Sequence, residues 1–189
     1  VIGLTGQTGA GKSTVSGLLA ENGVYCIDAD YLARKAVENP EVISALAEYF
    51  GGDIIVDGAL DRRELARRAF SDPVKQKKLN ATVHPEVTRL AVEEIHKAEN
   101  SGAKAALIDA ALLFESDLTS ICSFTVTVVA DAETRLERIM KRDSISREDA
   151  IIRMNAQKDE IYYTENADIV IRNNGEDLSE ELKKIIGKL

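Results

Sequence analysis

Residues 1–14 read VIGLTGQTGAGKST and join an apolar run, a glycine-rich loop and the start of a helical pattern. From Gly6 to Ser13 the residues match the motif G-x-x-x-x-G-K-S/T in full. Glycines let successive backbone N–H groups turn inward around a phosphate, and the following helix adds the positive end of its dipole. A glycine-rich turn before a helix that happens to begin Lys-Ser is the alternative. The flanking strand and helix favour a phosphate-binding loop.

The chemistry of this loop depends on two side chains at its end. Lys12 supplies a mobile cation for the β and γ phosphates of a nucleotide, and the hydroxyl of Ser13 is a ligand for Mg²⁺. The loop alone leaves ATPases, GTPases, kinases and silent nucleotide binders open. Residues elsewhere in the chain must decide among them.

Strand-like and helical segments alternate along the chain. The apolar runs that predict strands are Val1–Thr5, Val24–Asp28, Ala105–Asp109, Phe124–Val129 and Asp168–Ile171. The helical patterns are Lys12–Glu21, Tyr31–Val37, Pro40–Phe50, Asp61–Phe70, Pro73–Asn100, Ala132–Arg142, Arg147–Gln157 and Leu178–Ile186. Short loops cannot join parallel strands, so this alternation predicts an α/β fold with a five-stranded parallel sheet covered on both faces.

Two stretches interrupt the alternation. About three helices lie between the second and third strands, where a crossover needs one, and the segment after Val129 is helical and rich in arginine. We expect a helical substrate-binding insert at 39–102 and an Arg-rich helical lid at 131–165. The nucleotide-binding core then consists of 1–38, 103–130 and 166–189.

Composition limits the kinds of partner and of metal or disulfide site that the chain can have. The 189 residues are 44% hydrophobic and 30% charged, with a net charge of −8, so the chain as a whole would repel nucleic acid and anionic membranes. No apolar stretch approaches the roughly 20 residues of a membrane span. Only two cysteines and two histidines are present, which argues against a disulfide framework or a His-based metal centre and fits the cytoplasm.

Carboxylates follow two of the predicted strands. Asp28 closes the second strand and Asp30 follows it, whereas Asp109 ends the third strand. Transfer of a phosphoryl group to an alcohol needs a base for the hydroxyl proton, and Asp30 is our choice, although both Asp28 and Asp30 could be caps of the next helix. Asp109 resembles a Walker-B carboxylate, which holds Mg²⁺ directly or through water.

The predicted lid carries arginines on one helical stripe. Arg135, Arg138 and Arg142 follow the spacing i, i+3 and i+7, which places them on the same side of a helix. Like charges in this arrangement repel one another unless an anion lies between them, and a triphosphate suits guanidinium groups. The alternative is a solvated face balanced by the acidic residues Glu133, Glu137 and Asp143.

Taken in chain order, these segments resemble the dephospho-CoA kinase family from residue 1 to about residue 175. The residues that carry the resemblance are Ile2 to Gly6, Asp28-Ala29-Asp30 with Ala33-Arg34, Leu60-Asp61-Arg62 with Leu65 and Phe70, Leu79-Asn80, His84-Pro85, Asp109, Leu112 to Glu115, the lid arginines with Asp143, Gln157, Ala167-Asp168 and Asn173-Asn174-Gly175. Such an ordered series is far more specific than the loop by itself.

The resemblance implies a three-layer P-loop NTPase core and phosphorylation of the ribose 3′-hydroxyl of dephospho-CoA by ATP, with Mg²⁺. The catalytic residues it implies are Asp30, Lys12, Arg138 and Arg142. For ATP binding they are Gly6, Gly9, Ala10, Gly11, Lys12, Ser13, Thr14, Arg135 and Asn173, and for the metal Ser13 and Asp109. For the substrate they are Arg62, Leu65, His84, Leu112 and Phe114. We expect a monomer or weak homo-oligomer without nucleic acid or membrane partners.

Some positions depart from the family pattern or allow another interpretation. Gln7, Thr8 and Ala10 replace variable loop positions, which we expect to be harmless, and Ala111 stands where the family usually has Pro. Arg62 could be a surface partner of an acidic neighbour, and His84 a capping or packing residue at a kink. Two other functions remain: a kinase for a nucleoside monophosphate or sugar acid, and a regulatory module that binds nucleotide without turnover.

Overall fold

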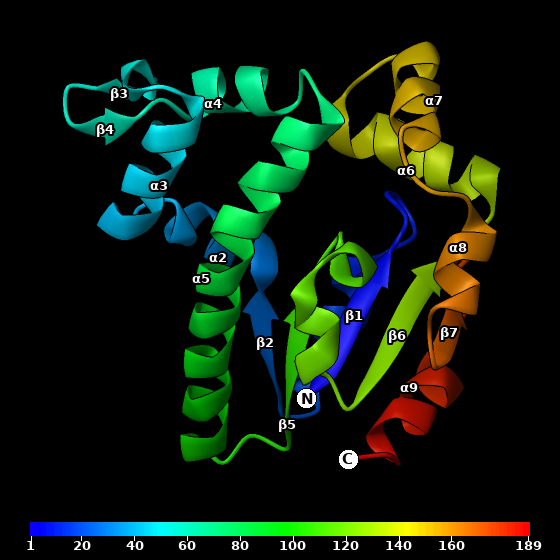
Figure 1. Ribbon diagram of the computed structural model, residues 1–189. Helices are drawn as coiled ribbons and strands as arrows, with labels where there is room; N and C mark the ends of the chain where they lie inside the picture. Colours follow the sequence, from blue (N-terminus) through cyan, green and yellow to red (C-terminus); the bar gives the residue numbers. More distant parts are fainter. The chain divides into compact units, whose positions relative to one another are not determined.

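The computed structural model describes all residues 1–189, shown in Figure 1. The chain forms two compact units. The first, which we call the nucleotide unit, contains Val1–Ile27 and Ile95–Leu189, and the second, the insert unit, contains Asp28–Glu94. The division into core, insert and lid made above stays a prediction. None of the helices is both long and apolar enough to cross a membrane.

A five-stranded sheet organises the nucleotide unit, with the order β2-β5-β1-β6-β7. The strands are β1 (Ile2–Gly6), β2 (Val24–Asp28), β5 (Ala105–Asp109), β6 (Phe124–Val129) and β7 (Ile169–Arg172). The first strand is central and pairs in parallel with β5 and β6, and β6 pairs in parallel with β7. The α/β fold class predicted from the sequence is confirmed.

Both faces of β1 are covered, because its side chains alternate. Ile2 and Leu4 are fully buried in an apolar cluster with α1 (Lys12–Glu21) and α9 (Ser179–Ile186). Gly3 points the other way, where an added Cβ would lie 2.7 Å from Leu113, in the 3₁₀ helix Leu113–Glu115. Side chains therefore pack against both faces of the strand that leads into the phosphate-binding loop.

Three helices follow β6, namely α6 (Ala132–Asp143), α7 (Arg147–Asn155) and α8 (Glu160–Glu165). The first two share a small apolar core of Leu136, Ile139 and Ala150. Ser144 joins them with a φ of 53°, a left-handed conformation that ends α6 sharply. The sequence pattern did not predict α8, which is only six residues long.

The insert unit is mainly helical. Its elements are α2 (Ala29–Ala36), α3 (Pro40–Phe50), the hairpin β3 (Ile55–Val56) and β4 (Ala59–Leu60), α4 (Arg62–Ala69) and most of α5 (Pro73–Asn100). The hairpin turns at Asp57 and Gly58, whose φ angles of 50° and 80° suit an Asp-Gly turn. The helices were predicted from the sequence, whereas the hairpin was not.

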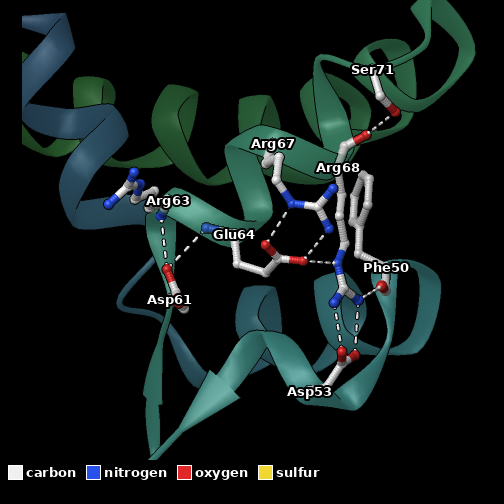
Figure 2. A network of polar contacts seen from close by, with 8 residues as sticks. All are labelled: Phe50, Asp53, Asp61, Arg63, Glu64, Arg67, Arg68 and Ser71. Atoms are coloured by element: carbon white, nitrogen blue, oxygen red, sulfur yellow. Dashed lines mark hydrogen bonds and ion pairs between the residues drawn. The ribbon is translucent and has the colours of Figure 1, made fainter.

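Arg68 ties three elements of the insert unit together (Figure 2). Its guanidinium group donates to the carbonyl oxygen of Phe50 at 2.6 Å, to both carboxylate oxygens of Asp53 at 2.8 and 2.5 Å, and to Glu64 at 2.6 Å. Arg67 also donates to Glu64. The end of α3, the segment before the hairpin and α4 are thus joined through one side chain.

These contacts predict an acid-sensitive contribution to stability. The hydrogen bond from Arg68 lowers the pKa of Asp53 to about 2, and hydrogen bonds from Arg67 and Arg68 lower the pKa of Glu64 to about 2. Because both pKa values fall on folding, the stabilisation is complete above the ordinary carboxyl range and disappears as pH falls through about 2. In Arg68→Met, the free energy of unfolding should depend less on pH between 5 and 2.

Urea unfolding at low ionic strength, followed by circular dichroism, measures this dependence. Arg63→Met is the matched control, because Arg63 lies on the same helix and only its backbone N–H bonds to Asp61 in the network. It should keep the pH dependence of the unaltered chain. Equal pH dependence in Arg68→Met and the unaltered chain would contradict the assignment.

Candidate active site

The phosphate-binding loop connects β1 to α1, and its backbone requires glycine at two positions. Gly9 and Gly11 have φ angles of 78° and 95°, which other residues rarely adopt. A Cβ on Gly9 would lie 2.7 Å from the carbonyl oxygen of Arg135, and one on Gly11 would lie 2.1 Å from the side-chain nitrogen of Asn173. The loop therefore lies directly against α6 and the segment after β7.

Donors from outside the loop bind three successive carbonyl groups. Arg135 Nε donates to Thr8 O at 2.9 Å, and Arg138 Nη1 donates to Gly9 O at 3.4 Å. The oxygen of Ala10 accepts from Arg138 Nη1 at 3.3 Å and from Asn173 Nδ2 at 3.0 Å. The N–H groups of Gly9, Gly11 and Ser13 have no acceptor within the chain. The carbonyl side of the loop is thus tied to the protein, and the amide side is left for an anion.

Lys12 and Asp109 form an ion pair beside the loop. Asp109 ends β5 at the position paired with Leu4 of β1, so adjacent strands deliver the two residues to the same edge of the sheet. Their side chains are 23% and 18% exposed, which leaves both within reach of a ligand. The structure thus brings together the cation expected to bind phosphates and the carboxylate expected to bind the metal.

The three lid arginines have different surroundings. Arg135 is buried, and burial lowers its pKa. Arg138 is half-buried and also donates to Asn173 O at 2.9 Å. Arg142 is exposed, pairs with Asp143 at 2.8 Å and lies 3.5 Å from Thr8 Oγ1. The shared stripe was correctly identified, but the first two arginines mainly support the loop, whereas the third forms an ion pair with the adjacent Asp143.

Two glutamines to which the sequence analysis assigned no contact also hold the loop. Gln7 is 5% exposed; its Oε1 accepts from Arg135 Nη1 at 2.7 Å, and its Nε2 donates to Lys158 O at 3.1 Å. Gln157 Oε1 accepts from the N–H of Thr8 at 2.7 Å. For Gln7 the only signal in the sequence was a long amide side chain among small loop residues, whereas Gln157 was named only through the family resemblance.

The segment after β5 is fixed through its backbone. Ala110 N donates to Leu4 O at 3.0 Å, and Thr5 Oγ1 donates to Ala111 O at 3.2 Å, so the segment is anchored without a proline at position 111. Leu112 is 63% exposed. The Phe114 ring packs edge-on against Tyr162, with ring centroids 6.2 Å apart.

The remaining predicted residues belong to the insert unit. Asp28 caps α2 by accepting from Tyr31 N at 2.9 Å, whereas Asp30 is the second residue of α2 and is exposed. Arg62 donates to Glu38 at 2.9 Å and to Arg34 O at 3.2 Å. Leu65 is buried and His84 is half-buried within α5. Of the two candidate caps, only Asp28 is therefore the N-cap residue.

The donors near the loop fit Mg²⁺ better than a transition metal. Ser13 offers an exposed hydroxyl and Asp109 a carboxylate, and Mg²⁺ prefers oxygen ligands of this kind. No group of three or more His, Cys, Asp and Glu residues could hold a metal ion by itself. Such a sparse set suits an ion that keeps several waters and is shared with substrate phosphates.

Comparison with protein families shows to which family the whole chain is related. The family model described as dephospho-CoA kinase matches residues 1–179. The chain belongs to the dephospho-CoA kinase family. It is thus a phosphotransferase of coenzyme A biosynthesis, with ATP as donor and an alcohol as acceptor, as the resemblance implied.

Individual members of the dephospho-CoA kinase family match almost end to end. The chain is 41% identical to dephospho-CoA kinase of Thermus thermophilus, covering 100% of this chain and 91% of the relative. Identity to that of Listeria innocua is 38%, covering 98% and 93%. The crystal structure of TT1252 from Thermus thermophilus superimposes with a TM-score of 0.80 at 40% identity, covering 100% and 96%.

Proposed function

We propose that the loop from Gly6 to Thr14 holds the phosphates of ATP, and that the γ-phosphoryl group is transferred to the ribose 3′-hydroxyl of dephospho-CoA, with ADP as the leaving group. The observation that carries this proposal is the loop's polarity. Its carbonyl oxygens at residues 8–10 accept from Arg135, Arg138 and Asn173, whereas the amides of Gly9, Gly11 and Ser13 have no partner in the chain. A row of unpaired amides at a helix N-terminus favours a bound phosphate.

Within this site each charged residue has a distinct role. Lys12 binds the β and γ phosphates, and Arg138 with Arg142 neutralises charge on the phosphoryl group during transfer. Arg135 and Asn173 act on ATP through the loop carbonyls that they bind. Ser13 and Asp109, the latter directly or through water, would hold Mg²⁺, which supplies further neutralisation of phosphate charge when bound.

Asp30 is the base in this proposal. It follows the end of β2 by two residues and is exposed, and its neighbour Asp28 is already engaged as the cap of α2. A carboxylate accepts the proton of the 3′-hydroxyl and orients its oxygen for attack.

Candidate residues for acceptor binding occur in each of the two units. Leu112 is an exposed apolar side chain next to the anchored residues 110–111, which supports contact with an apolar part of the substrate. Phe114 supports the same role, while Arg62 and His84 offer polar contacts. Leu65 is buried, so its contribution is to packing within the insert unit.

The cysteines and the net charge bear on the compartment in which the reaction takes place and on the kind of partner that the chain binds. Cys26 and Cys122 are free, and burial raises the pKa of both thiols, that of Cys122 to about 11. Unpaired, protonated cysteines support action in the reducing cytoplasm. The net charge of −8 supports a small-molecule substrate rather than nucleic acid as partner, and a monomer or weak homo-oligomer stays our expectation.

An acceptor screen tests the proposal. We expect ADP release from ATP and Mg²⁺ with dephospho-CoA, and only background release with AMP, CMP, shikimate or gluconate. Mass spectrometry should identify the product as CoA with its phosphate on the ribose 3′-oxygen. Faster turnover of another acceptor would replace dephospho-CoA as the substrate. Binding of Mg²⁺-ATP without transfer to any acceptor would identify a nucleotide-binding module instead.

A further inference from the structure

Gln7 lies at a loop position that phosphate binding leaves open to any residue, yet its side chain is 5% exposed and fully engaged. Its Oε1 accepts from Arg135 Nη1, and its Nε2 donates to Lys158 O. A guanidinium group can only donate and a carbonyl oxygen can only accept, so the two partners determine which way the amide is turned. One side chain therefore joins the loop to α6 and to the segment between α7 and α8.

Arg135 depends on Gln7 for pairing at its tip. Its Nε donates to Thr8 O and its Nη1 to Gln7 Oε1, while Nη2 is buried without a partner. If the Gln7 amide were removed, both terminal nitrogens of this buried guanidinium group would lack an acceptor. Unpaired charged donors are costly inside a protein, so Arg135 would have to move towards water. Movement of Arg135 would release Thr8 as well.

A second contact reinforces the first at the next residue. The N–H of Thr8 donates to Gln157 Oε1 at 2.7 Å, and Gln157 directly precedes Lys158. Two successive loop residues are thus held by α6 on one side and by residues 157–158 on the other. We call this arrangement the clasp, and its members are Gln7, Thr8, Arg135, Gln157 and Lys158.

We propose that Gln7 is a positioning residue for ATP. Its side chain couples the conformation of the phosphate-binding loop to the placement of α6 and of the segment between α7 and α8. This inference rests on the proposed ATP site. The amide of Gly9 follows the clasp immediately, so holding residues 7 and 8 fixes the first N–H group that faces the phosphates. The clasp also holds α6, which carries Arg138 and Arg142.

When the clasp is broken, ATP must order the loop and the lid as it binds, and this cost weakens ATP binding. Gln7→Ala should therefore raise the KM and the Kd for ATP about tenfold, the usual order for a buried hydrogen bond to a charged partner. The KM for dephospho-CoA should not change. Without nucleotide, backbone amides of 132–158 should exchange hydrogen faster than in the unaltered chain, and saturating ATP should restore much of their protection.

Gln7→Glu separates the two contacts of the side chain. The carboxylate still accepts from Arg135 but offers no donor to Lys158 O, so the KM for ATP should lie between those of the unaltered chain and Gln7→Ala. Gln76→Ala, at an exposed position of α5, is the matched control and should leave all these quantities unchanged. If Gln7→Ala fails to fold, Gln157→Ala breaks the clasp at a half-buried side chain and should produce the same selective rise for ATP.

The outcomes decide the proposal. Unchanged ATP affinity and unchanged exchange in Gln7→Ala would overturn it. Equal rises in both KM values with faster exchange throughout the chain would show a purely structural role and overturn it too. Kd and hydrogen exchange need no turnover. If the unaltered chain binds ATP but phosphorylates no acceptor, the proposed function fails, while a selective loss of ATP binding in Gln7→Ala still supports the clasp.

Discussion

Asp30→Asn should phosphorylate dephospho-CoA about 10²–10⁴-fold more slowly than the unaltered enzyme under single-turnover conditions, the usual contribution of a general base. Asparagine keeps the size and shape of the side chain but cannot accept the proton of the 3′-hydroxyl. Asp30 is exposed in the first turn of α2, so the substitution should leave folding unaffected. Rapid mixing of excess enzyme and ATP with dephospho-CoA, followed by quenching, measures the chemical step, and the Kd for ATP should stay the same.

Asp28→Asn is a closely matched control. Asp28 caps α2 through its hydrogen bond to Tyr31 N, and asparagine caps helices about as well as aspartate. The control should therefore keep both stability and the single-turnover rate. Near-normal chemistry in Asp30→Asn would exclude it as the base, and a large loss in Asp28→Asn alone would move the role to that residue.

Lys12→Met should lower kcat/KM about 10²–10³-fold, because it removes a preorganised cation from the β and γ phosphates. The apolar replacement has a similar length. The substitution also leaves Asp109 without the cation that it pairs with, so an uncompensated negative charge remains where phosphates bind. Steady-state kinetics with varied ATP should show a loss in kcat and not only a rise in KM, since the γ phosphate gains charge contacts during transfer.

Lys184→Met, on the exposed side of α9, is the control for removal of one positive charge from the nucleotide unit. Its kinetics should match those of the unaltered enzyme. A Lys12→Met variant with normal kcat and only weaker ATP binding would restrict Lys12 to ground-state binding.

Local pattern was enough to predict most of the fold. Three of the five strands, β2, β5 and β6, were predicted with their observed ends, and β5 and β6 are nearly continuous apolar runs that are mostly buried. The last strand begins one residue later than expected, since Asp168 uses its carboxylate to accept from Thr125 N at 2.7 Å. The hairpin at 55–60 escaped prediction because two-residue strands leave no periodicity to detect.

Sequence motifs predicted individual residues of the candidate site but not the contacts among them. Lys12 and Asp109 were chosen separately for their chemistry, and only the register of β1 and β5 shows that they meet. Gln7 was treated as a replaceable residue, although it binds partners near residues 135 and 158. Such contacts depend on how distant segments pack, and neither propensity nor spacing reports them.

The central position of β1 has a consequence for synthesis of the chain. Ile2 pairs with Leu107 on one side and with Phe124 on the other, so β1 leaves the ribosome long before the two strands that flank it. At about 5–20 residues per second, that delay is on the order of ten seconds, during which an apolar segment is open to aggregation. Asp28–Glu94 draws its contacts from one continuous segment and is complete sooner. A product truncated after α5 would lack both neighbours of β1 and therefore could not form a nucleotide site.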